Sequence, residues 1–171
     1  MRKFLVLVLS TFILASCATP PGPATRLEHA NVLPLQLNDN YQIRKIKRFF
    51  NDDDYQRIVT ESEVVNFERQ RINFGAVTDL DRRQRFGNYF TFFWRTTERS
   101  DVTVRLEYRQ AALNNYVMAQ ERYYPNARGS FETPFDVIGD DFLEYGRVTS
   151  WRVLLIVDGK IVALRQSFIW K

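Results

Sequence analysis

The chain of 171 residues has little of the side-chain chemistry on which most catalytic and metal sites depend. It contains one cysteine, Cys17, and one histidine, His29. A single cysteine excludes an internal disulfide, so the fold must be stable without covalent cross-links. A single histidine excludes a metal site built from several imidazoles, and it argues against a Ser-His-Asp triad.

Catalytic motifs are missing as well. The sequence has neither a Gly-x-Ser-x-Gly segment nor a glycine-rich phosphate loop. The acidic runs at 51–54 and 140–141 could supply oxygen ligands to calcium, but their spacing does not match an EF-hand loop and is more typical of solvated turns. We therefore expect a protein that is not an enzyme, with no catalytic residue, no metal and no cofactor.

The start of the chain has the form of a secretory signal. A short basic region at 2–3 precedes the mostly apolar run 4–14, and small residues then lead to Cys17. The apolar run is too short to span a bilayer comfortably. We therefore expect residues 1–16 to be a signal peptide that is removed.

The sequence Leu14-Ala15-Ser16-Cys17 resembles the lipobox of bacterial lipoproteins. The resemblance covers residues 1–18 and implies that Cys17 is lipidated and becomes the first mature residue. It also implies a place in the cell envelope, with acyl chains holding the protein to a membrane. Ala18 is not the aspartate associated with inner-membrane retention. The outer membrane is therefore implied, on its periplasmic side, with the cell surface as the alternative.

The composition describes one domain behind a short linker. Residues 17–34, which include Pro20-Pro21-Gly22-Pro23, are predicted to be a flexible tether. Residues 35–171 are sufficient for a single domain with a sizeable core. Removal of the signal leaves 22 basic and 20 acidic side chains, a formal charge of about +2. This charge does not imply a nucleic-acid partner.

The C-terminal part of the sequence gives the clearest structural signal. Asp158-Gly159 separates the apolar run 151–157 from the run 160–164. A type I′ turn needs positive φ at both central residues, and this dipeptide tolerates it. The pattern predicts a β-hairpin over 148–169.

Shorter patterns predict the remaining elements. Residues 101–110 alternate between apolar and polar side chains, which predicts a strand with one face in water. Residues 62–74 are ambiguous, because 60–63 has the spacing of a capping box whereas three β-branched residues follow it; we favour a strand. Other strands are predicted at 43–50, 88–96, 116–124 and 131–138, with turns at 97–100 and 125–129.

Short strands, frequent turn signals and the lack of a convincing long helix indicate an all-β fold. We expect an antiparallel β-sandwich, immunoglobulin-like or fibronectin-III-like. The alternative is a small lipocalin-like barrel, which the sequence supports less well because eight clean strands are not evident.

The strand predicted at 88–96 carries aromatic side chains on both faces. A sandwich strand needs only one apolar face, so the second is either covered by residues 35–74 or exposed for binding. Three arginines precede this strand; they could bind phosphate or carboxylate, or they are ordinary loop charge. The candidate partner-binding residues are Tyr89, Phe93, Arg82, Arg83 and Arg85.

The run Arg44-Lys45-Ile46-Lys47-Arg48 has two interpretations. It could meet anionic lipid headgroups. The interpretation that we favour is a solvated strand face with acidic residues opposite.

These features favour a lipid-anchored, extracytoplasmic protein that acts as a non-catalytic binding or assembly module of the cell envelope. A tethered module gains effective concentration near its partners, so modest affinity suffices. The expected partner, besides the membrane, is an envelope protein or a glycan. The alternatives are a small enzyme or ligand carrier with a pocket, and a purely structural envelope lipoprotein.

Overall fold

The computed structural model describes residues 22–52 and 62–170. The predicted signal peptide 1–16 and the predicted lipidation site, Cys17, lie outside the described residues. None of the described helices is long and apolar enough to cross a membrane. These helices are α3 (Glu63–Asn73), α4 (Asp79–Arg83) and α5 (Asp140–Tyr145), together with the 3-10 helix η2 (Ala111–Leu113).

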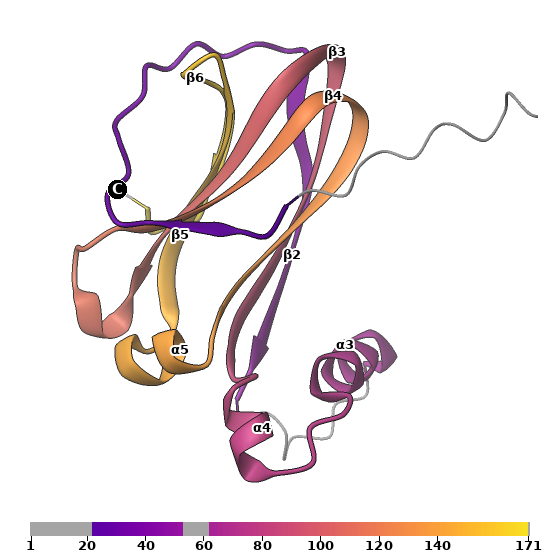
Figure 1. Ribbon diagram of the computed structural model, residues 1–171, viewed down its shortest axis with the longest axis vertical. Helices are drawn as coiled ribbons and strands as arrows, with labels where there is room; N and C mark the ends of the chain where they lie inside the picture. Colours follow the sequence, from indigo (N-terminus) through magenta and orange to yellow (C-terminus); the bar gives the residue numbers. More distant parts are fainter. Residues whose placement is uncertain (1–21, 53–61, 171) are drawn as a thin grey trace, which may run out of the picture.

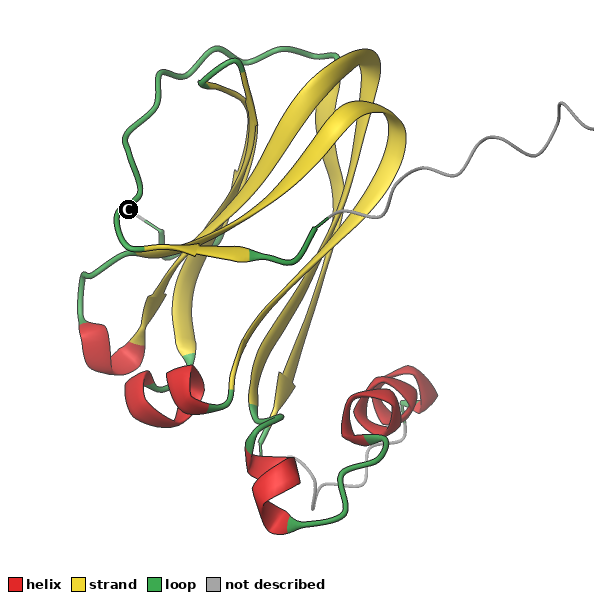
Figure 2. Ribbon diagram, in the orientation of Figure 1, coloured by secondary structure: helices red, strands yellow, loops and turns green. Residues whose placement is uncertain are grey.

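The strands form one antiparallel sheet (Figures 1 and 2). They follow the order β1-β4-β3-β5-β6, and β2 pairs with β3 outside this path. This architecture confirms the prediction of an all-β, antiparallel fold. The strands are β1 (Thr25–Leu27), β2 (Tyr41–Asn51), β3 (Gly87–Gln110), β4 (Met118–Ile138), β5 (Val148–Val157) and β6 (Lys160–Gln166).

Strands β3 and β4 are long, with 24 and 21 residues, and they pair along most of their length. The turns predicted at 97–100 and 125–129 are therefore wrong as chain reversals. The register shifts on both sides of Ser100, and the two strands bend there while pairing continues. Extra residues in one strand of an antiparallel pair bend it. Asn126 and Gly129 contribute positive φ values of 52° and 102° at this bend.

The bend divides the sheet into two arms that share one core. The β2 arm consists of β2 with residues 87–96 of β3 and 129–138 of β4; the β5 arm contains the rest of β3 and β4 with β1, β5 and β6. Phe92 of the β2 arm lies against Trp151 of the β5 arm, with ring centroids 5.9 Å apart. Both belong to a buried cluster that takes side chains from both arms. The inner faces of the two arms therefore pack against each other (Figure 1).

The predicted C-terminal hairpin is confirmed. Strands β5 and β6 pair in antiparallel register, with Val157 opposite Lys160. The two residues between them, Asp158 and Gly159, have φ values of 49° and 70°. Positive φ at both positions is what a type I′ turn requires.

Residues 63–73 are helical, so the strand predicted at 62–74 is wrong. Helix α3 begins after Ser62, with Glu63 in its first turn and Arg71 in its last, and charges in these places stabilise a helix. None of its residues is buried. Its β-branched side chains thus have no sheet neighbours to pack against, and the local helix signals prevail. The strand predicted at 43–50 is confirmed as part of β2.

The segment before β2 lies on the sheet. Strand β1 pairs with β4. Farther along, the Gln36 N–H donates to the Ile161 carbonyl at 2.9 Å, and the Ile161 N–H donates to the Pro34 carbonyl at 2.9 Å. Within the predicted tether, residues 25–34 therefore run along the folded body (Figure 1).

Candidate functional site

The structure distributes the five predicted contact residues over two neighbouring elements. Tyr89 and Phe93 lie in β3, on the outer face of the β2 arm, whereas Arg82 and Arg83 belong to α4 and Arg85 follows it. The Tyr89 hydroxyl donates to the Arg85 carbonyl at 2.8 Å, which joins the two groups. Arg82 forms an ion pair within α4, and Arg83 is exposed.

The Arg85 guanidinium fixes the end of α3. Its Nη1 donates to the carbonyl of Ile72 at 3.0 Å and to that of Phe74 at 2.6 Å. Carbonyls at the end of a helix have no partner within the helix, so this contact satisfies them. The buried Asn51 donates through Nδ2 to the Arg85 carbonyl at 2.9 Å. Arg85 therefore positions α3 beside β2.

Side chains of β2 partly cover the outer aromatic face. The ammonium groups of Lys45 and Lys47 lie 5.9 and 5.5 Å from the centre of the Phe93 ring, within range of a cation–π contact. The Phe49 ring lies 6.5 Å from that of Tyr89, and burial raises the pKa of Tyr89 to about 12. Both predicted aromatic contact residues are thus half-buried, and cations lie over Phe93.

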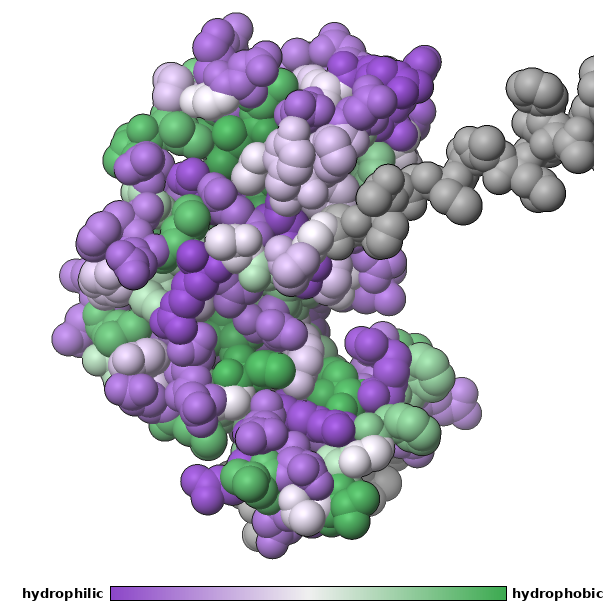
Figure 3. Space-filling view, viewed as in Figure 1, coloured by the Kyte–Doolittle hydropathy of each residue, from purple (hydrophilic) through white to green (hydrophobic). Residues whose placement is uncertain are grey.

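An open groove of about 1500 Å³ lies next to this face, between α3, β2, β5 and the C-terminal segment 167–169. Figure 3 shows the surface hollowed between α3 and the sheet. We call it the β2 groove, because residues 45–50 line it without interruption. Its volume exceeds the roughly 300–1,000 Å³ of ordinary small-molecule sites.

Cations line the β2 groove from both faces of β2. Lys45 and Lys47 lie on the outer face, while Arg48 lies on the inner face, in register with Phe90. The Arg48 guanidinium lies 5.9 Å from the Trp151 ring centre, and that of Arg147 lies 4.9 Å from the Phe50 ring centre. None of these four cations forms an ion pair with a carboxylate in residues 22–52 or 62–170.

Apolar side chains form the remaining walls of the β2 groove. Helix α3 contributes Val65 and Ile72, which are half-buried, and Val64, which is 73% exposed. The C-terminal segment contributes Phe168 and Ile169, which are 100% and 67% exposed. Exposed apolar groups of this size next to cations are typical of a binding surface.

Sequence reasoning found part of this groove and missed the rest. The basic run 44–48 was visible, with anionic lipid as the less favoured interpretation. The favoured one, acidic residues opposite on the sheet, is wrong, because Lys45, Lys47 and Arg48 stand opposite Phe93, Thr91 and Phe90. Arg147 and the α3 wall could not be added to it, because they come from segments about 100 and 20 residues away along the chain and only the fold places them at β2.

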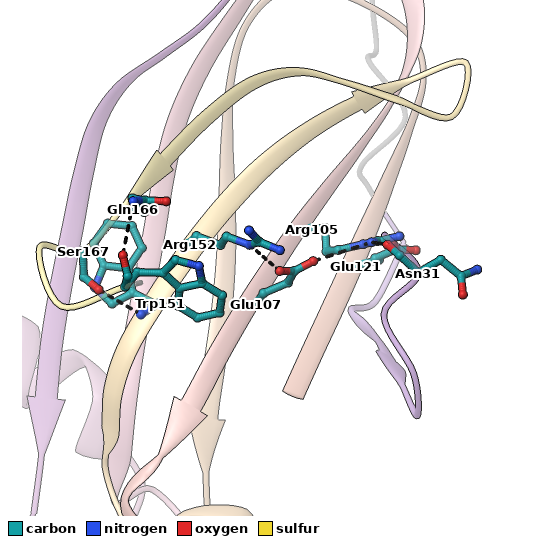
Figure 4. A network of polar contacts seen from close by, with 9 residues as sticks. Asn31, Arg105, Glu107, Glu121, Trp151, Arg152, Gln166 and Ser167 are labelled. Carbon is teal, nitrogen blue, oxygen red and sulfur yellow. Dashed lines mark hydrogen bonds and ion pairs between the residues drawn. The ribbon is translucent and has the colours of Figure 1, made fainter. Parts of the chain in front are cut away.

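A second polar cluster is buried in the β5 arm (Figure 4). Glu107 lies between Arg105 and Arg152, with N–O distances of 3.6 and 2.5 Å. Arg105 also pairs with Glu121 at 2.5 Å, and its Nη1 donates to the Asn31 carbonyl at 2.9 Å. Each charged side chain of this cluster therefore has an oppositely charged partner within it. Through Asn31 the cluster also holds the N-terminal segment to the sheet.

This cluster corrects the prediction that 101–110 has one face in water. Arg105 and Glu107 are 7% and 2% exposed. The alternation in sequence is real, but residues 28–38 cross the outer face of the β5 arm and exclude water from it. Charged side chains can be buried there because each has an opposite charge as partner.

Among the described residues, no group of three histidine, cysteine, aspartate or glutamate side chains is placed to hold a metal ion. Of the acidic residues considered for calcium, Asp53 and Asp54 lie outside the described residues, and Asp141 pairs with Arg26 at 2.6 Å. Comparison of the chain with protein families, curated proteins and solved structures yields no match. The function is therefore argued from the groove itself.

Proposed function

We propose that the chain is a lipid-anchored lipoprotein of the cell envelope that acts as a non-catalytic binding or assembly module. Cys17 carries the acyl chains, and the outer membrane, on its periplasmic side, is the proposed location. The support for the anchor is the lipobox-like sequence at 14–17. The support for binding is the β2 groove, where the cations Lys45, Lys47, Arg48 and Arg147 border apolar walls.

The folded body is proposed to be a bent relative of the immunoglobulin-like or fibronectin-III-like β-sandwich. This proposal is supported by the two arms, whose inner faces contact each other across one core. A scaffold of this kind holds the edge of β2 and helix α3 in fixed positions, so the groove between them is preformed.

The second candidate function is that of a ligand carrier. It is supported by the volume of the β2 groove, which is sufficient for a ligand larger than a simple ion. A carrier and a binding module differ in what occupies the groove, whereas a purely structural lipoprotein needs no occupant.

Two measurements in intact cells test the proposal. Cells that express the full chain are labelled with an alkyne analogue of palmitate; Cys17→Ser should abolish the label and release the protein from the membrane fraction. Label retained by the Cys17→Ser variant would contradict the proposed anchor.

The binding role is tested by chemical crosslinking in the same cells. We expect the double variant Lys45→Glu/Lys47→Glu to lose a crosslinked species that the unaltered chain captures. The matched control is Arg128→Glu/Arg165→Glu, which changes the charge equally at exposed positions away from the groove. An identical set of captured species in all three would contradict binding and favour the purely structural alternative.

A further inference from the structure

We propose that the β2 groove binds an anionic membrane lipid, with the phosphate-bearing headgroup at the cations of β2 and the acyl chain along α3. This inference rests on the proposed binding function and specifies its ligand class. It joins three features that the sequence places far apart: the basic strand β2, the apolar side of α3 and the exposed C-terminal Phe168.

The headgroup position follows from the charges. Lys45, Lys47 and Arg48 lie within about 10 Å along one strand, because each residue advances the chain by about 3.3 Å. Arg147, immediately before β5, adds a fourth cation. Against them the groove presents two carboxylates, Glu68 and Glu132, and Glu68 already pairs with Arg71 at 2.9 Å. A group with negative charge is therefore the complementary occupant.

The position of the acyl chain follows from the apolar walls of the β2 groove. A phosphate group alone would leave most of a 1500 Å³ groove unfilled. The same groove is also bordered by Val64, Val65 and Ile72 of α3 and by Phe168 and Ile169. These side chains lack the hydrogen-bonding groups that a glycan would need, and they match a hydrocarbon chain.

An added peptide strand is a poorer occupant of the same groove. Strand β2 pairs with β3 along one edge, and its other edge borders the groove. However, the register of β2 is interrupted between Ile43 and Lys45, and lysines follow at once. Bulges and lysines are the features with which proteins prevent a further strand from pairing at an edge.

Lipid capture from vesicles tests this inference. The full chain is reconstituted in phosphatidylcholine vesicles that contain a small share of diazirine-bearing phosphatidylglycerol, or of diazirine-bearing phosphatidylcholine in a parallel sample. After illumination, the crosslinked residues are mapped by mass spectrometry. We expect the anionic lipid to label α3 and the segment 167–169, and the zwitterionic lipid to label them at least about tenfold less.

Variants test the contribution of the cations. Lys45→Glu/Lys47→Glu should lower capture of the anionic lipid by about tenfold or more, because each cation near an anionic surface contributes roughly a factor of five. Arg128→Glu/Arg165→Glu should leave capture unchanged, and circular dichroism checks that both variants fold. Equal capture of both lipids, no label in the groove, or no effect of the β2 variant would overturn the proposal.

Competitors distinguish lipid from other anions. Inorganic phosphate added before illumination should not reduce the lipid label. If phosphate abolishes the label completely, the groove is assigned to free phosphate. Removal of the label by polyglutamate, with phosphate ineffective, would assign the groove to an acidic peptide, and either result overturns the lipid. Failure of acylation at Cys17 would refute the proposed anchor and leave this measurement unaffected, because the vesicles supply the lipid.

Discussion

The two arms of the sheet use the same strand in different ways. In both, inward-facing residues of β3, such as Phe92 and Leu106, are buried. On the outer face, Phe93 of the β2 arm is half-buried under lysine side chains, whereas Glu107 of the β5 arm is almost completely buried. The alternation of side chains is alike in the two arms; the difference lies in what covers the outer face.

The cover determines which arm can bind a ligand. Residues 28–38 close the outer face of the β5 arm, and its charges, including Arg105 and Glu107, are neutralised by one another. On the β2 arm the cations Lys47 and Arg48 lie over aromatic rings. No carboxylate of the described residues pairs with these two cations, so their charge is available to an anion, and the binding surface is therefore expected on the β2 arm.

The largest difference in stability is expected between variants at two neighbouring residues of β3. Phe92→Ala should lower the free energy of unfolding by about 3–5 kcal/mol, because it opens a cavity in the core shared by both arms. Phe93→Ala should cost less than about 1 kcal/mol, since the ring is only half-buried and lies under the exposed side chains of Lys45 and Lys47. Urea unfolding of the two variants measures the difference. Equal losses would show that the outer face of the β2 arm is as well packed as the inner face.

The charged cluster of the β5 arm should be nearly as sensitive. Glu107→Ala leaves Arg105 buried without its full set of partners, and we expect a loss of about 3–5 kcal/mol in the free energy of unfolding. The comparison is Arg26→Ala, which removes a partly exposed ion pair with Asp141 and should cost about 1 kcal/mol or less. Similar losses in these two variants would contradict the closure of the β5 arm by residues 28–38.

Local signals were sufficient for the parts of this fold that depend on adjacent residues. Asp158-Gly159 predicted the hairpin because the turn conformation is a property of those two residues. The bend near Ser100 was not predictable, because turn-forming residues are equally compatible with a reversal and with a bulge between continuing strands. The choice depends on pairing between β3 and β4, which the sequence does not display.

The burial of side chains on the outer faces of the sheet was likewise not predictable from the sequence. Arg105 and Glu107 have the alternation of solvent-exposed residues, but the segment that crosses them comes from more than 70 residues earlier in the chain, where the Asn31 carbonyl accepts from Arg105. For the candidate site, the sequence revealed individual components but not their arrangement in one groove. Tyr89 and the basic strand were visible, but the groove requires α3 to lie beside β2, where Arg85 holds it.

A smaller effect is expected at the hairpin of the β5 arm. Gly159 has a φ of 70°, and no atom lies within 4 Å of a Cβ placed there. The cost of a side chain is therefore conformational, and Gly159→Val should lower the free energy of unfolding by about 1–2 kcal/mol. Gly159→Asn should cost less, because asparagine adopts this conformation more readily. An unchanged melting temperature for the valine variant would contradict the type I′ turn.

The smallest expected effect concerns how dry the outer face of the β2 arm is. Burial raises the pKa of Tyr89 from its ordinary value of 10 to about 12, so the folded state holds the phenolic proton more tightly than the unfolded state does. This contribution to stability is complete below pH 10 and is lost as the pH rises through about 12.

Tyr89→Phe separates this contribution from those of the other tyrosines. The variant loses the hydrogen bond to the Arg85 carbonyl, so at neutral pH it should be less stable than the unaltered chain by about 1 kcal/mol. Because phenylalanine does not ionise, the gap should narrow above pH 10, close well before pH 12 and reverse its sign as the pH approaches 12. Urea unfolding at several alkaline pH values measures the gap, and difference absorbance of tyrosinate gives the pKa directly. A Tyr89 that titrates at its ordinary value would mean that water reaches the outer face of the β2 arm freely, so that Phe49 and α3 do not shield it.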